Sequence, residues 1–325
     1  NIKIVRGAHK LLGIIARRSI RSYHTRSFAS ALNRNLRRYD LERYDLLFSI
    51  GSSEVAFLRT DVPIVHLTDA TYAQMVGYYD GFDMGTKRNR DADDIQRRAY
   101  ENSTQLMMMS RWTADSARKD YGVPEEKINV LKFGANQDVP DALPERRRGG
   151  KLRLLFVGKE WQRKGGQIAV DALTSLRRKG IDAELTMVGC EAPIEVQSVP
   201  HVTIHPFVAD VASFFMNADM FILPTRAECA GIVFCEASAY GLPSFTTDTG
   251  GVPDYVEDGV NGRLLPLDAT GEDFADAIAE LWNDENAMEA MRLSARRRYE
   301  EELNWDVWLE RFEEIARKAL TASKE

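Results

Sequence analysis

The sequence predicts an α/β protein built from two doubly wound, Rossmann-like domains in series. Its 325 residues are too many for one ordinary domain and suit two. Short apolar runs alternate with helical stretches in both halves, a rhythm typical of parallel sheets covered by helices on both faces. Between the halves, residues 139–150 hold two prolines, three consecutive arginines and a glycine pair, a composition typical of a domain boundary.

The first half, residues 1–140, is expected to form the first Rossmann-like domain. Short apolar runs predict strands at 44–50, 62–67, 106–109 and 128–133. Helical patterns lie between them at 91–102 and 113–121, and Gly122 ends the second.

The second half repeats the alternation over residues 141–303. It predicts strands at 152–157, 183–188, 202–205, 220–223 and 244–246, and helices at 166–179, 211–217 and 233–240. A long helical tail follows over 274–320. We expect its last part, 304–325, to pack back on the N-terminal domain.

The charge distribution is uneven along the chain. The net charge is −6, yet residues 1–40 contain ten Lys and Arg against one acid. This segment suits an anionic membrane surface, and a solvated helix face explains the same residues. The apolar runs are too short to span a bilayer, and three cysteines without a metal-binding spacing fit a reducing cytoplasm. We expect a cytoplasmic protein, peripheral at most at the inner face of the membrane, with no nucleic-acid partner.

Two carboxylates eight residues apart give the strongest chemical signal, within PTRAECAGIVFCEASAYGLP. Glu228 should lie in the loop after a buried strand, and Glu236 about one turn into the next helix. The first N–H groups of that helix, at Gly231 and Ile232, should be free to bind an anion with the help of the helix dipole. The alternative is a pair of exposed carboxylates that the same dipole stabilises.

A basic loop in FVGKEWQRKGG gives the second signal. Gly158 turns the chain out of a strand, and Arg163 and Lys164 precede a helix that opens at Gly165 or Gly166. Two cations beside a helix N-terminus suit a diphosphate, although a solvated basic loop would look similar. No metal ligands are evident in the sequence.

Glycines supply a third signal in TDTGGVPDYVEDGVNG. Gly250 and Gly251 follow a strand, and both could adopt positive φ and let the main chain approach a phosphate or sugar. A tight turn is the alternative. Gly259 and Gly262 are expected to form a turn.

These segments resemble the retaining glycosyltransferases of family 4, which have the two-domain GT-B fold and an E-x7-E signature. The resemblance covers residues 44–320, and it implies that the domain of residues 1–140 binds the acceptor and the domain of residues 141–303 binds the nucleotide sugar. It implies that Glu228 binds the donor sugar, Glu236 the ribose hydroxyls, and the basic pair the leaving pyrophosphate. Many members have an aromatic residue where Ala230 stands here, which bears on the shape of the sugar pocket.

The resemblance also assigns roles to less distinctive positions. The loop around Val208 would cover the nucleotide base, and Asn136 of the FGAN turn could face the donor, although a simple turn is equally plausible. Where many members carry a histidine, this chain has Asp69, a candidate for sugar or acceptor contact or for the N-cap of a helix near Ala70. His66 should be a core residue of the strand.

The beginning of the chain departs from the family pattern. Members usually open with a strand and a glycine-rich loop that touches the donor diphosphate, whereas this chain opens with NIKIVRGAHKLLGI. We therefore expect the N-terminal domain to lack that first strand and loop.

The predicted function is metal-independent transfer of a hexose from a UDP-, GDP- or ADP-sugar to a hydroxyl group, with retention of configuration. The acceptor would be a glycan, a lipid or a small molecule, and no cofactor is expected. The alternative is an inactive relative that only binds a sugar nucleotide or serves as a scaffold. A nicotinamide dehydrogenase is excluded because no G-x-G-x-x-G follows a strand.

Overall fold

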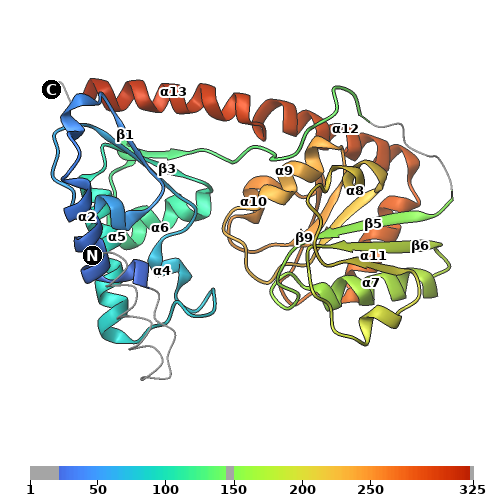
Figure 1. The fold of residues 1–325 in the computed structure, drawn as a ribbon. Helices are drawn as coiled ribbons and strands as arrows, with labels where there is room; N and C mark the ends of the chain where they lie inside the picture. The colour runs from blue at the N-terminus through green and yellow to red at the C-terminus, as the bar shows by residue number, and fades with distance from the viewer. Residues whose placement is uncertain (1–21, 144–149, 323–325) are drawn as a thin grey trace. The chain divides into compact units, whose positions relative to one another are not determined.

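The computed structural model describes residues 22–143 and 150–322, which form two compact units (Figure 1). The first unit runs to Leu131 and takes in the chain again from Leu309, and the second comprises Lys132–Trp308. The division therefore falls earlier than the expected border at 140 and later than the one at 303. The basic residues 1–21 lie outside the described part of the chain.

The first unit contains a four-stranded parallel sheet whose strands are neighbours in sequence order. Its strands are β1 (Leu47–Ser49), β2 (Ile64–Thr68), β3 (Gln105–Met108) and β4 (Ile128–Val130). All four were expected, but β1 and β4 are shorter than their apolar runs. From residue 22 onward, no strand precedes β1 in the structure; two turns of 3-10 helix and the helix α2 come first.

Helices surround this sheet, and their ends follow from local sequence signals. Thr25 caps α2 by accepting from the Phe28 N–H, and Ser110 caps α6 in the same way from Thr113. Gly122, at φ +66°, ends α6. The helical elements of the unit are η1 (Ser22–His24), α2 (Arg26–Leu36), η2 (Leu41–Arg43), α3 (Ser52–Val55), α4 (Tyr72–Met75), α5 (Thr86–Asn102), α6 (Arg111–Tyr121) and η3 (Glu125–Lys127).

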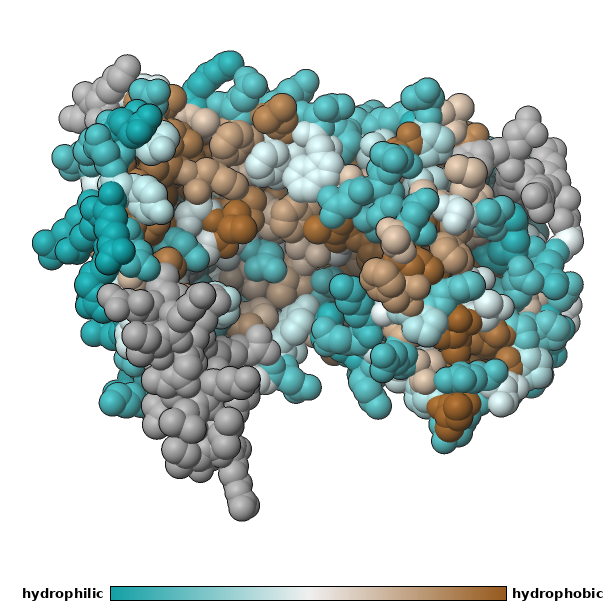
Figure 2. All heavy atoms as spheres, viewed as in Figure 1, coloured by the Kyte–Doolittle hydropathy of each residue, from teal (hydrophilic) through white to brown (hydrophobic). Residues whose placement is uncertain are grey.

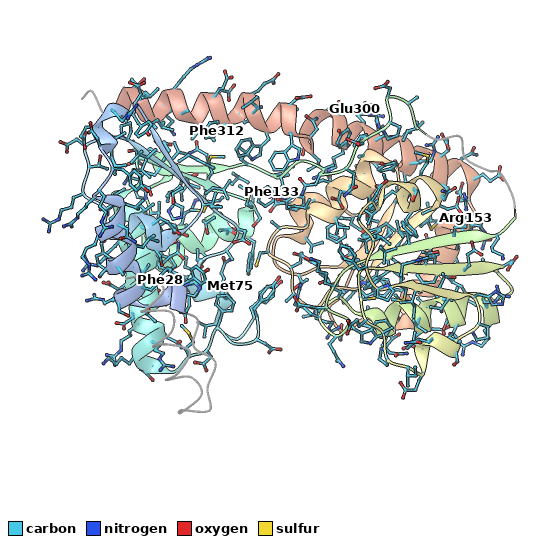
Figure 3. The ribbon with its side chains drawn as sticks, in the orientation of Figure 1. Phe28, Met75, Phe133, Arg153, Glu300 and Phe312 are labelled. Atoms are coloured by element: carbon cyan, nitrogen blue, oxygen red, sulfur yellow. The ribbon has the colours of Figure 1, made fainter. Side chains whose placement is uncertain are left out.

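The final helix, α13 (Trp305–Ala322), completes the first unit. The ring of Phe312 packs edge-on against that of Phe48, with the centroids 5.3 Å apart (Figure 3). Lys318 Nζ donates a hydrogen bond of 2.6 Å to the carbonyl oxygen of Glu126. Residues from Leu309 onward are thus a structural part of the unit that begins the chain.

The second unit has a six-stranded parallel sheet in the order β10-β9-β8-β5-β6-β7. The chain places β6 and β7 on one side of β5 and then returns to place β8 on the other side. The order of the strands therefore reverses between β5 and β8. The strands are β5 (Leu152–Val157), β6 (Ala183–Val188), β7 (Val202–His205), β8 (Met220–Leu223), β9 (Ser244–Thr247) and β10 (Gly262–Leu265).

The edge strand β10 corrects the sequence prediction, which placed Gly262 in a turn. Gly262 pairs with Ser244 of β9, and a Cβ at this position would run into the Ser244 carbonyl oxygen. Only Gly259, at φ +76°, has the backbone of a turn glycine. Gly262 is therefore a glycine because of close packing within the sheet.

The helices of the second unit follow the expected alternation, but the long tail is divided into three. Asp284 begins α12 by accepting from the N–H groups of Asn286 and Ala287. The helical elements are α7 (Gly166–Arg178), η4 (Val196–Ser198), α8 (Ala212–Asn217), α9 (Ile232–Ala239), α10 (Val252–Tyr255), α11 (Gly271–Trp282) and α12 (Glu285–Glu302), before α13.

A buried ion pair fixes the two central strands of the second unit relative to each other. Arg153 of β5 donates to Asp219, just before β8, from its main-chain N (2.8 Å), Nε (3.0 Å) and NH2 (2.8 Å). Figure 3 labels Arg153 at the start of β5. Three bonds to one carboxylate set the register of β5 and β8, so the loops at their carboxyl ends start from fixed positions. In the described part, no helix is both long and apolar enough to cross a bilayer.

Candidate functional site

Three loops of the second unit meet at the carboxyl edge of its sheet. They follow β5, β8 and β9, which are adjacent strands. The first two loops flank the point where the strand order reverses, and parallel α/β sheets bind ligands in the crevice outside such a point. Gly158, Arg163 and Lys164 lie in the first loop, Glu228 and Ala230 in the second, and Gly250 and Gly251 in the third.

Hydrogen bonds tie these loops together. The Arg163 carbonyl oxygen accepts from the Arg226 N–H at 2.6 Å and from Thr225 Oγ1 at 3.4 Å. The Gly251 N–H donates to the Glu228 carbonyl oxygen at 3.0 Å. The three loops therefore form one connected platform, which holds Glu228 between its neighbours.

An ion pair lies across the reversal point. Lys164 Nζ donates a hydrogen bond to Glu228 Oε2, and their side chains are 12% and 11% exposed. A Cβ on Gly158 would lie 3.1 Å from Lys164 Cγ, so the glycine leaves room for the lysine stem. The structure thus brings Gly158 and Lys164 of the basic loop together with Glu228, which the sequence analysis identified from a different segment.

Arg163 is engaged by a residue that sequence reasoning missed. Its Nε and NH2 groups donate to the two carboxylate oxygens of Glu160 at 2.9 and 3.0 Å, and NH1 donates to the Ala227 carbonyl oxygen at 2.8 Å. NH1 also lies 3.9 Å from Glu228 Oε2. The Arg163 guanidinium therefore lies beside the ion pair, and Glu160 fixes its orientation. The three-residue spacing between Glu160 and Arg163 was the sequence signal from which this contact could have been predicted.

Gly165 explains how close the first two loops can approach. It is the N-cap of α7 at φ +72°, and a Cβ there would run into the carbonyl oxygen of Pro224. Both its backbone conformation and its lack of a side chain are required. The helix opens at Gly166, as predicted.

Glu236 lies in the second turn of α9 and is 7% exposed. Burial raises the pKa of its carboxyl group, while hydrogen bonds from the Gln137 side chain and the Asn136 main chain oppose that rise. The side chain of Asn136 accepts from Trp305 Nε1 at 3.1 Å. The main chain of Asn136 thus supports Glu236, as does the side chain of Gln137, which the sequence analysis overlooked, and the donor contact expected of Asn136 stays a prediction.

The N-terminus of α9 differs from the prediction. The Ile232 N–H, expected to be free, donates to the Ala230 carbonyl oxygen at 3.2 Å. Gly231 caps the helix at φ −89°, an ordinary backbone angle, and a Cβ there would run into the Phe234 ring. Packing against Phe234 therefore requires this glycine, while Ala230 is half-buried beside it.

The remaining loops of the second unit match the prediction in part. Gly250 has φ +54°, but Gly251 has φ −85° and caps α10, so only the first requires the left-handed backbone. Val208 lies in the loop after β7, half-buried against the core of the unit. Its side chain therefore serves packing, which leaves the main chain of the loop for any ligand contact.

In the first unit, Asp69 directly follows β2 at the carboxyl edge of the sheet. It is exposed and lines a cavity of about 320 Å³ together with Thr68, Ile50 and Tyr72. The helix cap that was its alternative role belongs to Thr71, whose hydroxyl accepts from the Gln74 N–H at 3.2 Å. That alternative was wrong because the helix begins at Tyr72, later than expected.

His66 is a core residue of β2, as predicted. It is fully buried, and burial lowers its pKa to about 4. Neither ring nitrogen has a hydrogen-bond partner. Among residues 22–143 and 150–322, no group of three or more His, Cys, Asp or Glu is placed to hold a metal ion.

Comparison with known proteins agrees with this geometry. A family model described as glycosyl transferases group 1 matches residues 151–284, which include all three loops. A solved structure of sucrose-phosphate synthase from Thermosynechococcus elongatus aligns with a TM-score of 0.67 at 17% identity, covering 91% of this chain and 78% of that one. The structural match confirms the predicted GT-B fold with its two parallel sheets.

Two sequence relatives are named D-inositol 3-phosphate glycosyltransferase. The protein from Arthrobacter sp. (strain FB24) is 30% identical over 285 residues, which cover 79% of this chain and 67% of the relative. The protein from Paenarthrobacter aurescens (strain TC1) is 30% identical over 230 residues, which cover 63% of this chain and 56% of the relative. This chain thus spans between half and two thirds of their length. With a 30% identical relative matched over two thirds of its length, the chain belongs to the group 1 glycosyltransferases.

Proposed function

We propose that this protein transfers a sugar from a nucleotide diphosphate sugar to an acceptor hydroxyl, with retention and without a metal ion. The observation that carries the proposal is the Lys164–Glu228 ion pair at the strand-order reversal, with the Arg163 guanidinium 3.9 Å from the same carboxylate oxygen. Cations are thereby held where parallel sheets bind phosphate groups.

Donor binding would exchange partners in this cluster. The diphosphate oxygens accept from Lys164 and Arg163, and this transfer frees Glu228 to accept from hydroxyls of the donor sugar. As the bond between the sugar and the diphosphate breaks, negative charge grows on the departing phosphate, and the two cations stabilise it. The acceptor hydroxyl then attacks the oxocarbenium-like carbon from the face that the diphosphate leaves, and its proton passes to an oxygen of the departing phosphate.

Glu236 and the cavity near Asp69 would bind the outer parts of the two substrates. A buried carboxylate fixed by Gln137 and Asn136 suits the paired hydroxyls of a ribose. The cavity of about 320 Å³ lies at the carboxyl edge of the first sheet, the edge at which ligands bind in such folds. We assign the acceptor to this cavity and the donor to the second unit.

The proposal is tested first by ligand binding. UDP-, GDP- and ADP-sugars are compared by thermal shift, because a ligand that binds only the native state raises the midpoint of unfolding. The donor found is then incubated with candidate acceptors, with and without EDTA, and the anomeric configuration of the product is read by NMR. Loss of activity with EDTA would contradict a metal-free mechanism, and an inverted product would contradict retention.

Variants of the basic loop separate transfer from binding alone. Arg163→Ala and Lys164→Ala should each lower turnover about 100-fold or more, as loss of one group that stabilises transition-state charge does. Lys159→Ala, an exposed lysine of the same loop, is the matched control. Equal turnover in all three variants would remove the basic pair from the mechanism. Tight donor binding without transfer or hydrolysis would identify the protein as a binding module.

A further inference from the structure

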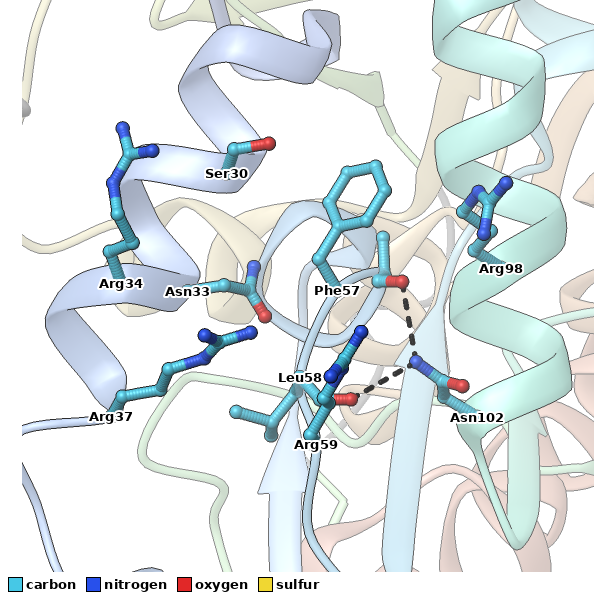
Figure 4. A pocket seen from close by; sticks show the side chains of 10 residues that line it. Ser30, Asn33, Arg34, Arg37, Phe57, Leu58, Arg59, Arg98 and Asn102 are labelled. Atoms are coloured by element: carbon cyan, nitrogen blue, oxygen red, sulfur yellow. Dashed lines mark hydrogen bonds between the residues drawn. The ribbon is translucent and has the colours of Figure 1, made fainter.

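A second cavity in the first unit is lined by four arginines (Figure 4). Its volume is about 450 Å³. Arg34 and Arg37 come from the end of α2, Arg59 from the loop between α3 and β2, and Arg98 from α5. Figure 4 shows the α2 arginines on one side of the cavity, and Arg59 and Arg98 on the other.

This cavity lies at the opposite edge of the sheet from the proposed acceptor site. Its walls are the C-terminal ends of α2 and α5 and the loop that leads into β2. These segments precede the strands, so they mark the amino edge, whereas Asp69 follows β2 at the carboxyl edge. The arginine cavity is therefore a separate site that the proposed function does not use.

The positive charge of this cavity is largely uncompensated. In the described part of the chain, no hydrogen bond or ion pair is formed by the side chains of Arg34, Arg37 or Arg59. Arg98 donates to Asp94 at 2.9 Å and lies over the Phe57 ring at 5.5 Å. No lining residue is acidic. Arginines near helix ends often bind free carbonyl oxygens, but these three do not, so they are available to an anion.

A buried side-chain amide in the cavity places a second requirement on the ligand. Asn33 lines the cavity and is 2% exposed, and its Nδ2 donates to the carbonyl oxygens of Ala29 and Ser53 at 2.8 Å each. These two bonds fix the orientation of the amide and leave Oδ1 without a partner. A buried acceptor of this kind favours a ligand with a hydrogen-bond donor. An anion with no donor would leave it unsatisfied.

The wall of the cavity opposite α2, formed by residues 56–59 and α5, is held in place by hydrogen bonds within the protein. Asn102 Nδ2 donates to the carbonyl oxygens of Val55, Ala56 and Leu58 at 3.0, 3.3 and 3.4 Å. Figure 4 shows two of these bonds as dashed lines. Strongly hydrophilic side chains gather on the surface around α2, at the left of the view in Figure 2. The site thus combines a fixed wall with a cationic rim.

We propose that this cavity binds a phosphate ester that also carries a hydroxyl group. The phosphate oxygens accept from Arg34, Arg37 and Arg59, and the hydroxyl donates to Asn33 Oδ1. Two sources share this chemistry: a soluble polyol phosphate, and the headgroup of a lipid such as phosphatidylglycerol. The inference does not depend on the transfer reaction, since none of these residues belongs to the proposed donor or acceptor site.

Calorimetry on the whole protein tests the proposal with glycerol 3-phosphate as the soluble probe and phosphatidylglycerol vesicles as the lipid probe. The double variant Arg37→Gln/Arg59→Gln should bind the probe at least about tenfold more weakly than the wild type does. This is the loss in affinity expected when charged hydrogen bonds are removed. Arg38→Gln combined with Arg90→Gln removes the same charge from exposed positions that do not line the cavity, and should leave binding unchanged.

The ligand itself tests the role of Asn33, because replacing that residue would also remove its structural bonds. Methyl phosphate, which lacks the hydroxyl of glycerol 3-phosphate, should bind more weakly than glycerol 3-phosphate. Binding of glycerol 3-phosphate alone would identify a soluble ligand, and binding of vesicles alone a lipid headgroup. Equal losses in the two double variants, or no binding of either probe, would overturn the proposal.

Discussion

Lys164 Nζ donates to Glu228 Oε2 across the point where the strand order of the second sheet reverses. Each residue follows a different central strand, and the two lie 64 residues apart in the chain. In the absence of a ligand, the cation and the carboxylate satisfy each other in a nearly enclosed setting. The ion pair therefore holds both side chains in a defined position between the two loops.

Removing one member of this pair should destabilise the second unit. Lys164→Met removes the cation that is hydrogen-bonded to Glu228, while Arg163 stays 3.9 Å away, and we expect a loss of about 1–3 kcal/mol in the free energy of unfolding. Lys164→Met combined with Glu228→Gln should recover part of that loss. Denaturant unfolding of the wild type, both single variants and the double variant measures the coupling. Strictly additive losses would mean that the ion pair contributes nothing to stability.

Glu236→Gln should abolish donor binding or weaken it strongly. The amide keeps the size of the side chain but loses the charged acceptor, which is worth about 1.5–3 kcal/mol. Titration of the donor measures the change, and Glu301→Gln, at an exposed position of α12, is the control. Unchanged affinity in Glu236→Gln would show that this carboxylate does not bind the ribose.

The same variant has a consequence for stability against pH. The folded-state pKa of Glu236 is raised above the unfolded value of 4.5, so the folded protein holds this proton more tightly. The resulting stabilisation is fully present below pH 4.5 and is lost as the pH rises through the folded pKa. Unfolding free energies of Glu236→Gln, measured upward from pH 4.5, should decline less than those of the wild type. Parallel curves would contradict a perturbed carboxyl group.

His66→Leu should stabilise the first unit, most strongly in acid. Its two buried ring nitrogens lack partners, and replacing them should gain about 1–3 kcal/mol at neutral pH. The folded pKa of about 4 lies below the ordinary value of 6.5, so the wild type loses stability as the pH falls from 6.5 to about 4. The shift in the pKa of His66 corresponds to a loss of about 3 kcal/mol in the free energy of unfolding. Chemical denaturation at pH 7 and pH 5 should show a larger gain for the variant at pH 5.

Gly165→Ala should disrupt the contact between the first two loops. It combines a left-handed backbone with a clash against the Pro224 carbonyl oxygen. Gly180→Ala is a matched control, since Gly180 has φ +85° and nothing lies within 4 Å of its added Cβ. Backbone strain alone costs about 1–2 kcal/mol in either variant. A larger fall in thermal stability and a loss of donor binding should occur only in Gly165→Ala, and equal effects would exclude the steric role of Gly165.

The alternation of apolar runs with helical patterns was enough to predict nearly every strand that positions the site. Glu228, Glu236 and the basic pair could be selected as candidates because strand, loop and helix signals surround them, and the structure places Glu228 and the basic pair at one edge of the sheet. The edge strand β10 was missed because Gly262 is a poor strand former by itself. Its need for a glycine comes from Ser244, a neighbour across the sheet that no local pattern identifies.

Hydrogen-bond partners were the other part that the sequence could not supply. The Glu160 carboxylate that orients Arg163, and Gln137 beside Glu236, are ordinary polar residues in loops. The hydrogen bond from the Ile232 N–H to the Ala230 carbonyl oxygen depends on the backbone conformation at the start of α9. The packing of the Phe234 ring against Gly231 fixes that conformation. Such details are set by packing between segments, whereas sequence patterns describe one segment at a time.

The return of the chain to its first unit bears on the order of synthesis. A protein emerges from the ribosome N-terminus first, and domains generally fold as units as they appear. Here the unit that begins the chain also includes the residues from Leu309 onward, with Phe312 against Phe48 and Lys318 on the Glu126 carbonyl oxygen. Any structure that the first unit forms during translation lacks these residues until the whole second unit has been translated. Residues 22–131 are thus translated before the second unit, but the unit to which they belong is completed only after it.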